Sequence, residues 1–94
     1  MGLPLEVEAR ILTAGAEQAK TQADYDQAKQ LYTKALTLLE HAHGKLSMEV
    51  AVICMDIAEM FEESGNSNES LIYIERMCNI VSYQKSHYDN PLLV

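Results

Sequence analysis

The sequence predicts an all-α domain in which four main helices form two antiparallel helical hairpins. Hydrophobic residues make up 48% of the chain but aromatic residues only 6%, so the apolar mass is aliphatic and favours helices over sheet. Only 2 Pro and 4 Gly occur among 94 residues, which leaves little of the turn chemistry that an all-β chain needs. Between these breakers, apolar residues recur at the spacing of a helix face.

The first helix is predicted over about residues 5–23. Pro4 suits a first helical turn, because the N–H that proline lacks would have no partner there. The expected core stripe consists of mostly small residues, which would let a partner helix approach closely. Its members are Leu12, Gly15, Ala16, Ala19 and Ala23.

The second helix is predicted over about residues 25–43. Asp24 is a favourable N-cap, Gln27 completes a capping-box pattern, and Gly44 ends the helix. Its apolar positions are Ala28, Leu31, Tyr32, Ala35, Leu36, Leu38, Leu39 and Ala42.

The third helix is predicted over about residues 48–64, with Ser47 as its cap and Gly65 after its end. One apolar stripe is expected to face the core. Its members are Val50, Ile53, Cys54, Ile57, Ala58 and Phe61.

The fourth helix is predicted over about residues 67–86, after a cap formed by Asn66 with Glu69. The expected main stripe consists of Leu71, Ile74, Cys78 and Val81, and a second set of apolar residues consists of Ile72, Tyr73, Met77 and Ile80. A helix that is apolar on two sides expects neighbours on two sides. Asn90 and Pro91 break the chain within a tail over residues 87–94, which ends in Leu92, Leu93 and Val94 and could fold back as a partial lid.

Composition and charge narrow the class of protein. The chain has 7 basic and 14 acidic residues, a net charge of −7, which makes a nucleic-acid surface unfavourable. No uncharged run is long enough to cross a bilayer, and the first residues lack the apolar segment of a signal peptide. Two Cys do not make a secreted disulfide framework. We therefore expect one acidic cytoplasmic domain over residues 1–94, with no membrane contact.

The two predicted hairpins, about residues 5–43 and 48–86, can be aligned so that Ala23 falls opposite Gly65, 42 positions later. Residues 24–36 read DYDQAKQLYTKAL and resemble the second helix of a tetratricopeptide (TPR) repeat. Residues 57–65, IAEMFEESG, resemble the end of the first helix of that repeat. The spacing of 42 residues is similar to kinesin-light-chain repeats rather than to the standard period of roughly 34 residues.

The TPR resemblance implies a non-catalytic interaction module that binds a peptide or helix of a partner in a concave groove, as part of a scaffold or adaptor. The resemblance places the groove on the first helix of each hairpin, at Arg10, Thr13, Ala14, Glu17, Lys20 and Thr21 and at Val52, Met55, Asp56, Glu59, Glu62 and Glu63. The Lys/Asn/Arg clamp of chaperone-binding members is missing, so binding of chaperone C-terminal tails is not expected.

Acidic residues dominate the second hairpin. No Lys or Arg occurs between Lys45 and Arg76, and Asp56, Glu59 and Glu63 share one helix face. One interpretation is a groove for a peptide with Lys or Arg, in which charge steers association. The other interpretation is a solvated face that keeps the chain soluble. The sequence leaves both open.

Two repeats are fewer than the three that such arrays usually need for stability. One alternative function is therefore homo-oligomerisation through an apolar face of the fourth helix, formed by Ile72, Tyr73, Met77, Ile80 and Tyr83. Continuation into further repeats is a second explanation. The remaining alternatives are a three-helix module that binds helical sorting motifs and an ordinary four-helix bundle.

The sequence contains no constellation expected of an enzyme, metal site or cofactor site. Cys54 and Cys78 both occupy apolar stripes, which predicts inert core thiols that could lie near each other. His41 and His43 are two positions apart on a helix, so they point to different faces and cannot chelate one metal together. Their expected role is structural, near the negative end of a helix dipole.

Overall fold

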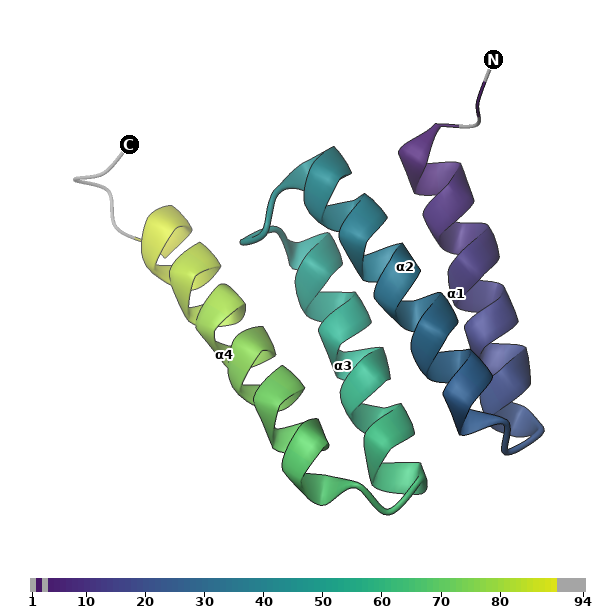
Figure 1. The fold of residues 1–94 in the computed structure, drawn as a ribbon. Helices are drawn as coiled ribbons and strands as arrows, with labels where there is room; N and C mark the ends of the chain where they lie inside the picture. Colours follow the sequence, from purple (N-terminus) through teal and green to yellow (C-terminus); the bar gives the residue numbers. More distant parts are fainter. Residues whose placement is uncertain (1, 3, 90–94) are drawn as a thin grey trace.

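The computed structural model describes residues 2 and 4–89, with side chains described as far as His87. This part of the chain contains helices and no strands, which confirms the all-α prediction (Figure 1). The helices are α1 (Leu5–Thr21), α2 (Tyr25–His43), α3 (Met48–Glu63) and α4 (Ser67–Asp89). None of these described helices is both long and apolar enough to span a bilayer.

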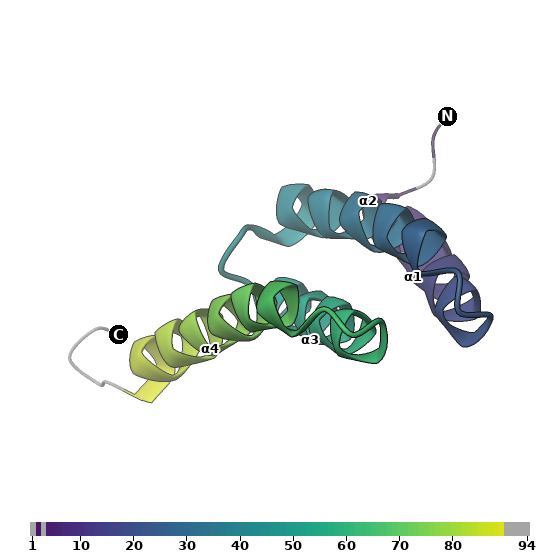
Figure 2. The same ribbon diagram turned by 60° about the horizontal axis from the view of Figure 1, so that its bottom comes forward.

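Consecutive helices run antiparallel, and each packs against the next one along the chain (Figure 1). The pairs α1/α2 and α3/α4 are hairpins, and α2 against α3 is the main contact between them. An ion pair between Arg76 and Glu40 also links α4 to α2. The principal extents are 48 × 40 × 14 Å, and Figure 2 shows the two hairpins stacked as successive steps. The described helices therefore form an open stack rather than a closed four-helix bundle.

Local capping chemistry fixes where two helices begin. The Gln27 N–H donates to the Asp24 side chain at 3.2 Å, and the Val50 N–H donates to Ser47 Oγ at 3.3 Å. Each bond satisfies a backbone donor that the first helical turn leaves without a partner. Both caps were predicted from the sequence, and both are confirmed.

The helices α1 and α3 end in the same backbone motif. Ala23 and Gly65 both have positive φ, 60° and 82°. The N–H of the following residue, Asp24 or Asn66, donates to the carbonyl five positions earlier, at 2.8 and 2.7 Å. This is the Schellman arrangement, in which glycine is preferred at the left-handed position. The prediction that Ala23 lies in the core stripe is therefore wrong, because α1 ends at Thr21 and Ala23 lies in the turn.

Burial repeats with the same offset of 42 positions. The positions of α1 that pack into the first hairpin match positions of α3 that pack into the second. The buried residues are Ala9, Ala16 and Ala19 in α1 and Ala51, Ala58 and Phe61 in α3. Helix α3 has a second buried stripe, formed by Val50, Ile53, Ile57 and Met60, because it has a neighbour on each side. The positional agreement supports treating the chain as two copies of one unit.

Helix α4 turns a different face to α3 than the sequence predicted. Ile80 is buried, and Tyr73 and Met77 pack against the core, whereas Leu71 and Val81 of the expected main stripe are exposed. The predicted self-association face is thus divided. Tyr73, Met77 and Ile80 belong to the hairpin contact, and only Ile72 and Tyr83 remain exposed. The helix also continues to Asp89, beyond the predicted end near Ser86. The predicted lid, Leu92 to Val94, lies outside the described residues.

Candidate functional site

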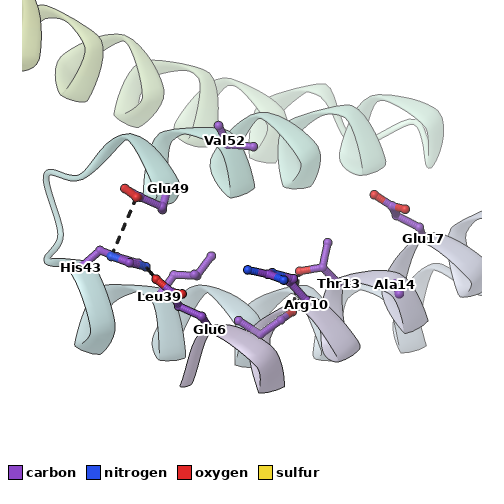
Figure 3. A pocket seen from close by; sticks show the side chains of 10 residues that line it. Glu6, Arg10, Thr13, Ala14, Glu17, Leu39, His43, Glu49 and Val52 are labelled. Carbon is purple, nitrogen blue, oxygen red and sulfur yellow. Dashed lines mark hydrogen bonds and ion pairs between the residues drawn. The ribbon is translucent and has the colours of Figure 1, made fainter. Parts of the chain in front are cut away.

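A cavity of about 550 Å³ lies between α1 and α3, next to the end of α2 (Figure 3). Its polar lining residues come mostly from one face of α1, and Val52 lies opposite on α3 (Figure 3). The lining residues are Glu6, Ala9, Arg10, Thr13, Ala14, Glu17, Leu39, His43, Glu49 and Val52.

The packing of α1 against α2 orients the polar face. Ala9, Ala16 and Ala19 are buried in the hairpin contact. Because the helix turns by 3.6 residues, Arg10 and Glu17, which are seven positions apart, share a different face, the one turned to the cavity. The small residues in the hairpin contact thus determine which side chains line the groove.

His43 joins three helices at one end of the groove. Its Nε2 lies 2.7 Å from Oε1 of Glu6, and its Nδ1 lies 3.8 Å from Oε2 of Glu49. Figure 3 shows the imidazole between these two carboxylates, with Glu17 at the far end of the cavity. The contacts tie the first turn of α1 and the first turn of α3 to the last residue of α2.

Lys20 makes the corresponding connection further along the groove. Its Nζ lies 3.8 Å from Glu59 and 4.0 Å from Glu63, so a cation on α1 meets two carboxylates on α3. The Lys20 side chain is only 18% exposed, whereas those of Glu59 and Glu63 are 59% and 43% exposed. The two carboxylates therefore remain open to a second cation from solution.

Asp56 belongs to the same acidic group. Burial raises the pKa of its carboxyl, and the nearby charges of Glu17 and Glu59 raise that pKa further, against a smaller opposing effect of Lys20. The single lysine on this side therefore does not compensate the negative charge around Asp56. We refer to Glu17, Asp56, Glu59 and Glu63 as the acidic cluster.

Tyr32 of α2 lies beneath the acidic cluster. The residue is 1% exposed, and its hydroxyl oxygen has no hydrogen-bond partner within the described part of the chain. Burial is the largest cause that raises the pKa of Tyr32 to about 12, and the charges of Asp56, Glu17, Glu59 and Glu63 add to it. All four carboxylates are thus near enough for their charge to act on one phenol.

The structure brings together most of the predicted groove residues. Arg10, Thr13, Glu17 and Val52 line the cavity, and Lys20 meets Glu59 and Glu63 between α1 and α3, outside that lining. Met55 and Glu62 are exposed on α3 but do not line the cavity. The sequence analysis missed Glu6, Ala9, Leu39, His43 and Glu49. Four of them come together within the first hairpin, and Glu49 is added when the second hairpin stacks on it, so no pattern within one helix signals this end of the site.

Metal-ligating and nucleophilic side chains were the other candidates for chemistry in the described part of the chain. Within residues 4–87, no group of three His, Cys, Asp or Glu side chains is placed to hold a metal ion. Cys54 is buried, and burial raises the pKa of its thiol, which makes it a poor nucleophile. Cys78 is exposed, so the prediction that both thiols lie in the core is wrong for Cys78. Its stripe lies on the flank of α4 that α3 does not cover.

Comparisons with known proteins return no matching family model, no matching curated protein and no matching solved structure. The TPR resemblance thus stays a prediction from the residues of this chain.

Proposed function

We propose that the chain is a non-catalytic, TPR-like interaction module that binds a partner peptide carrying Lys or Arg in the groove between α1 and α3. The observation that carries this proposal is that an open cavity between α1 and α3 reaches the acidic cluster at Glu17, while the other three carboxylates lie further along α3. The proposed setting is a cytoplasmic scaffold or adaptor, with no nucleic acid, membrane or cofactor involved.

Apolar side chains on α3 supply the contact area. Val52 is 52% exposed at the cavity and Met55 is 49% exposed beside it. Covering such side chains removes apolar surface from water, which is a main source of affinity in a peptide groove. An unbranched Met side chain also adapts its shape to different partners.

Charge supplies the selection. Glu59 and Glu63 are half-exposed and already lie near the Lys20 cation, which supports binding of an ammonium group from a partner. Burial and like charges together raise the pKa of Asp56, so a cation near this carboxylate would relieve an unfavourable state. Basic peptides should therefore bind faster and more tightly than acidic ones.

The position of α4 favours this module over the three-helix alternative. Ile80 of α4 is buried in the core, and Ser70 is fully buried as well. A three-helix module would have no use for a fourth helix that completes the core.

Fluorescence anisotropy tests the proposal. The probes are fluorescein-labelled peptides in which Leu alternates with Lys or Arg, and matched peptides in which Glu replaces the basic residues. We expect binding of the basic peptides only, with an affinity that falls steeply as NaCl is raised. The double variant Glu59→Lys, Glu63→Lys should weaken binding at least tenfold.

The matched control is the double variant Glu69→Lys, Glu75→Lys, which makes the same charge change on exposed positions of α4. It should bind the basic peptides nearly as well as the unchanged chain. Equal losses in both double variants would mean that net charge alone attracts the peptide, and the groove proposal would then be wrong. Salt-insensitive binding would also contradict it.

A further inference from the structure

Helix α4 carries an apolar stripe that no described helix covers. Leu71 is 59% exposed, Val81 is 42% exposed, Cys78 is exposed and Ile74 is half-buried. The four residues follow one another at spacings of three, four and three, so they form one continuous face. We call this face the α4 stripe.

The internal repeat shows what kind of element covers such a face. The α4 stripe lies 42 positions after Lys29, Tyr32, Leu36 and Leu39 of α2. Tyr32 and Leu36 are only 1% and 7% exposed, and Leu39 packs against the core. In the first hairpin this face contacts α3, because Lys29 Nζ lies 5.9 Å from the centre of the Phe61 ring and the charges of Asp56, Glu59 and Glu63 act on Tyr32. The α4 stripe is therefore the counterpart of a surface that receives a helix of the α3 type.

A helix of that type with a free face exists in the chain, namely α1. The second buried stripe of α3, from Val50 to Met60, corresponds to Glu8, Ile11, Gly15 and Gln18 of α1. Ile11 is 57% exposed and Val7 is 37% exposed, and Ala14 is exposed beside them. Ala14 lines the cavity of the candidate site, so we call only Val7 and Ile11 the α1 stripe.

We propose that a second copy of this chain docks its α1 stripe on the α4 stripe, so that copies join head to tail in the way that α2 joins α3 within one chain. Charge agrees with this arrangement. An antiparallel pairing brings Lys85, near the end of α4, toward Glu8, in the first turn of α1. Both side chains are exposed.

The two docking surfaces are different, so the contact is heterologous. One copy uses α4 and its neighbour uses α1, which leaves a free stripe at each end of every pair. Assembly should therefore grow with concentration into trimers and longer species instead of stopping at a symmetric dimer.

Sedimentation velocity and light scattering test the inference on the full chain, from low micromolar to near-millimolar concentration. We expect the average mass to rise with concentration for the unchanged chain. Leu71→Glu removes one stripe and Ile11→Glu removes the other, so each variant alone should stay monomeric. An equimolar mixture of the two should form a 1:1 dimer and nothing larger, because one intact stripe remains on each partner.

The matched control is Ile72→Glu, a change at a residue that is 57% exposed on a different flank of α4, and it should assemble like the unchanged chain. Circular dichroism establishes that each variant is folded, and Val81→Glu replaces Leu71→Glu if the latter loses its helical signal. Cys78 gives a second measurement. Its reaction with a maleimide should slow at least severalfold as assembly proceeds, while buried Cys54 does not contribute.

Three outcomes would overturn the inference. A chain that stays monomeric at all concentrations, for example because its own last residues cover α4, has no such contact. A dimer that Ile11→Glu does not disrupt is symmetric and does not use α1. A failure of the mixed variants to form a dimer excludes a contact between the two stripes. These results are independent of peptide binding, because neither Leu71 nor Ile11 lines the cavity.

Discussion

Ser70 is a buried polar residue whose counterpart in the first hairpin is an alanine. It is 0% exposed, and its Oγ has no hydrogen-bond partner in the described part of the chain. The position 42 residues earlier holds Ala28, which is also 0% exposed. Burying a hydroxyl removes its hydrogen bonds to water, and without a partner in the protein no hydrogen bond replaces them, so the folded state is destabilised.

We expect Ser70→Ala to raise the free energy of unfolding by about 1–2 kcal/mol, as the unsatisfied hydroxyl disappears. Urea unfolding followed by circular dichroism measures the change. Ser82→Ala, at an exposed position of the same helix, is the control and should change stability by less than about 0.5 kcal/mol. A destabilised Ser70→Ala would mean that the hydroxyl has a partner.

Ala23 holds a backbone conformation that suits glycine. Its φ is 60°, in the motif that Gly65 adopts at the end of α3. A residue with a Cβ is strained in this region by about 1–2 kcal/mol. Glycine avoids that strain, but it loses more conformational entropy on folding, which offsets part of the gain. We expect Ala23→Gly to stabilise the chain by about 0.5–1 kcal/mol and Gly65→Ala to destabilise it.

Thermal unfolding measures both of these changes. The control is Ala14→Gly, an exposed position within α1, where glycine should cost about 1 kcal/mol because the helix gains no relief of strain. Equal losses for Ala23→Gly and Ala14→Gly would contradict the explanation.

At the scale of the helix, the sequence predicts what is local. The caps at Asp24 and Ser47 and the helix end before Gly65 depend on neighbours a few residues away, and the structure confirms them. The face that α4 turns to α3 is not local. Both apolar stripes of α4 have helical periodicity, so the sequence does not distinguish them. Only the packing angle between α3 and α4 determines that the stripe containing Ile80 is buried.

The groove residues likewise divide into those that the sequence predicts and those that depend on how the helices pack. The resemblance to a repeat located Arg10, Thr13, Glu17 and Val52, because each occupies a regular place on a helix face. His43 and Glu6 lie 37 positions apart in the chain and meet when α1 and α2 form the first hairpin, whereas Glu49 joins them only when the second hairpin stacks on the first. Spacing within a single helix does not connect these three residues, so this end of the site was not predicted from the sequence.

Asp56 gives the acidic face of α3 a dependence on pH. Its pKa is raised above the ordinary value of 3.8, so the folded chain holds this proton more tightly than the unfolded chain does. The stabilising contribution of the protonated group is therefore present at low pH and is lost as the pH rises through the folded pKa. At neutral pH the ionised carboxylate is unfavourable.

We accordingly expect Asp56→Asn to stabilise the chain at pH 7, by about 0.2–0.5 kcal/mol for each like-charged neighbour. The gain should vanish below the ordinary pKa of 3.8, where the native carboxyl is protonated as well. Urea unfolding at a series of pH values measures it. Glu75→Gln, on the exposed surface of α4, is the control, and a matching gain there would assign the effect to net charge.

For the whole molecule, the net charge of −7 sets how stability responds to salt. Repulsion among the carboxylates opposes the folded state, and salt screens it. The ion pairs of Lys20 and Arg76 in the described part of the chain are partly exposed, so screening them costs less stability than screening the repulsion restores.

We therefore expect the midpoint of thermal unfolding to rise as NaCl is increased from low to physiological ionic strength. Circular dichroism melts in NaCl measure the shift, and the same series with a neutral osmolyte is the control. A midpoint that falls with salt would show that the ion pairs outweigh the repulsion.

Repetition is the feature of the whole molecule that the sequence predicts best. The offset of 42 residues appears in the turns at Ala23 and Gly65 and again in the buried stripes of α1 and α3. The open stack follows from it, because a unit that packs against its successor in a fixed way cannot close on itself after two copies. The side chain at each position of a helix face differs between the two copies, and the repeat does not determine it.

The walls of the groove belong to different hairpins, which meet mainly through α2 and α3. The contacts across the opening that the described residues make are those of His43 with Glu49 at one end and of Lys20 with Glu59 and Glu63 at the other. Such exposed polar contacts are weak compared with a packed interior. We therefore expect the separation of the two walls to adjust to the width of a bound segment, and a bound segment to make the joint between the hairpins more rigid.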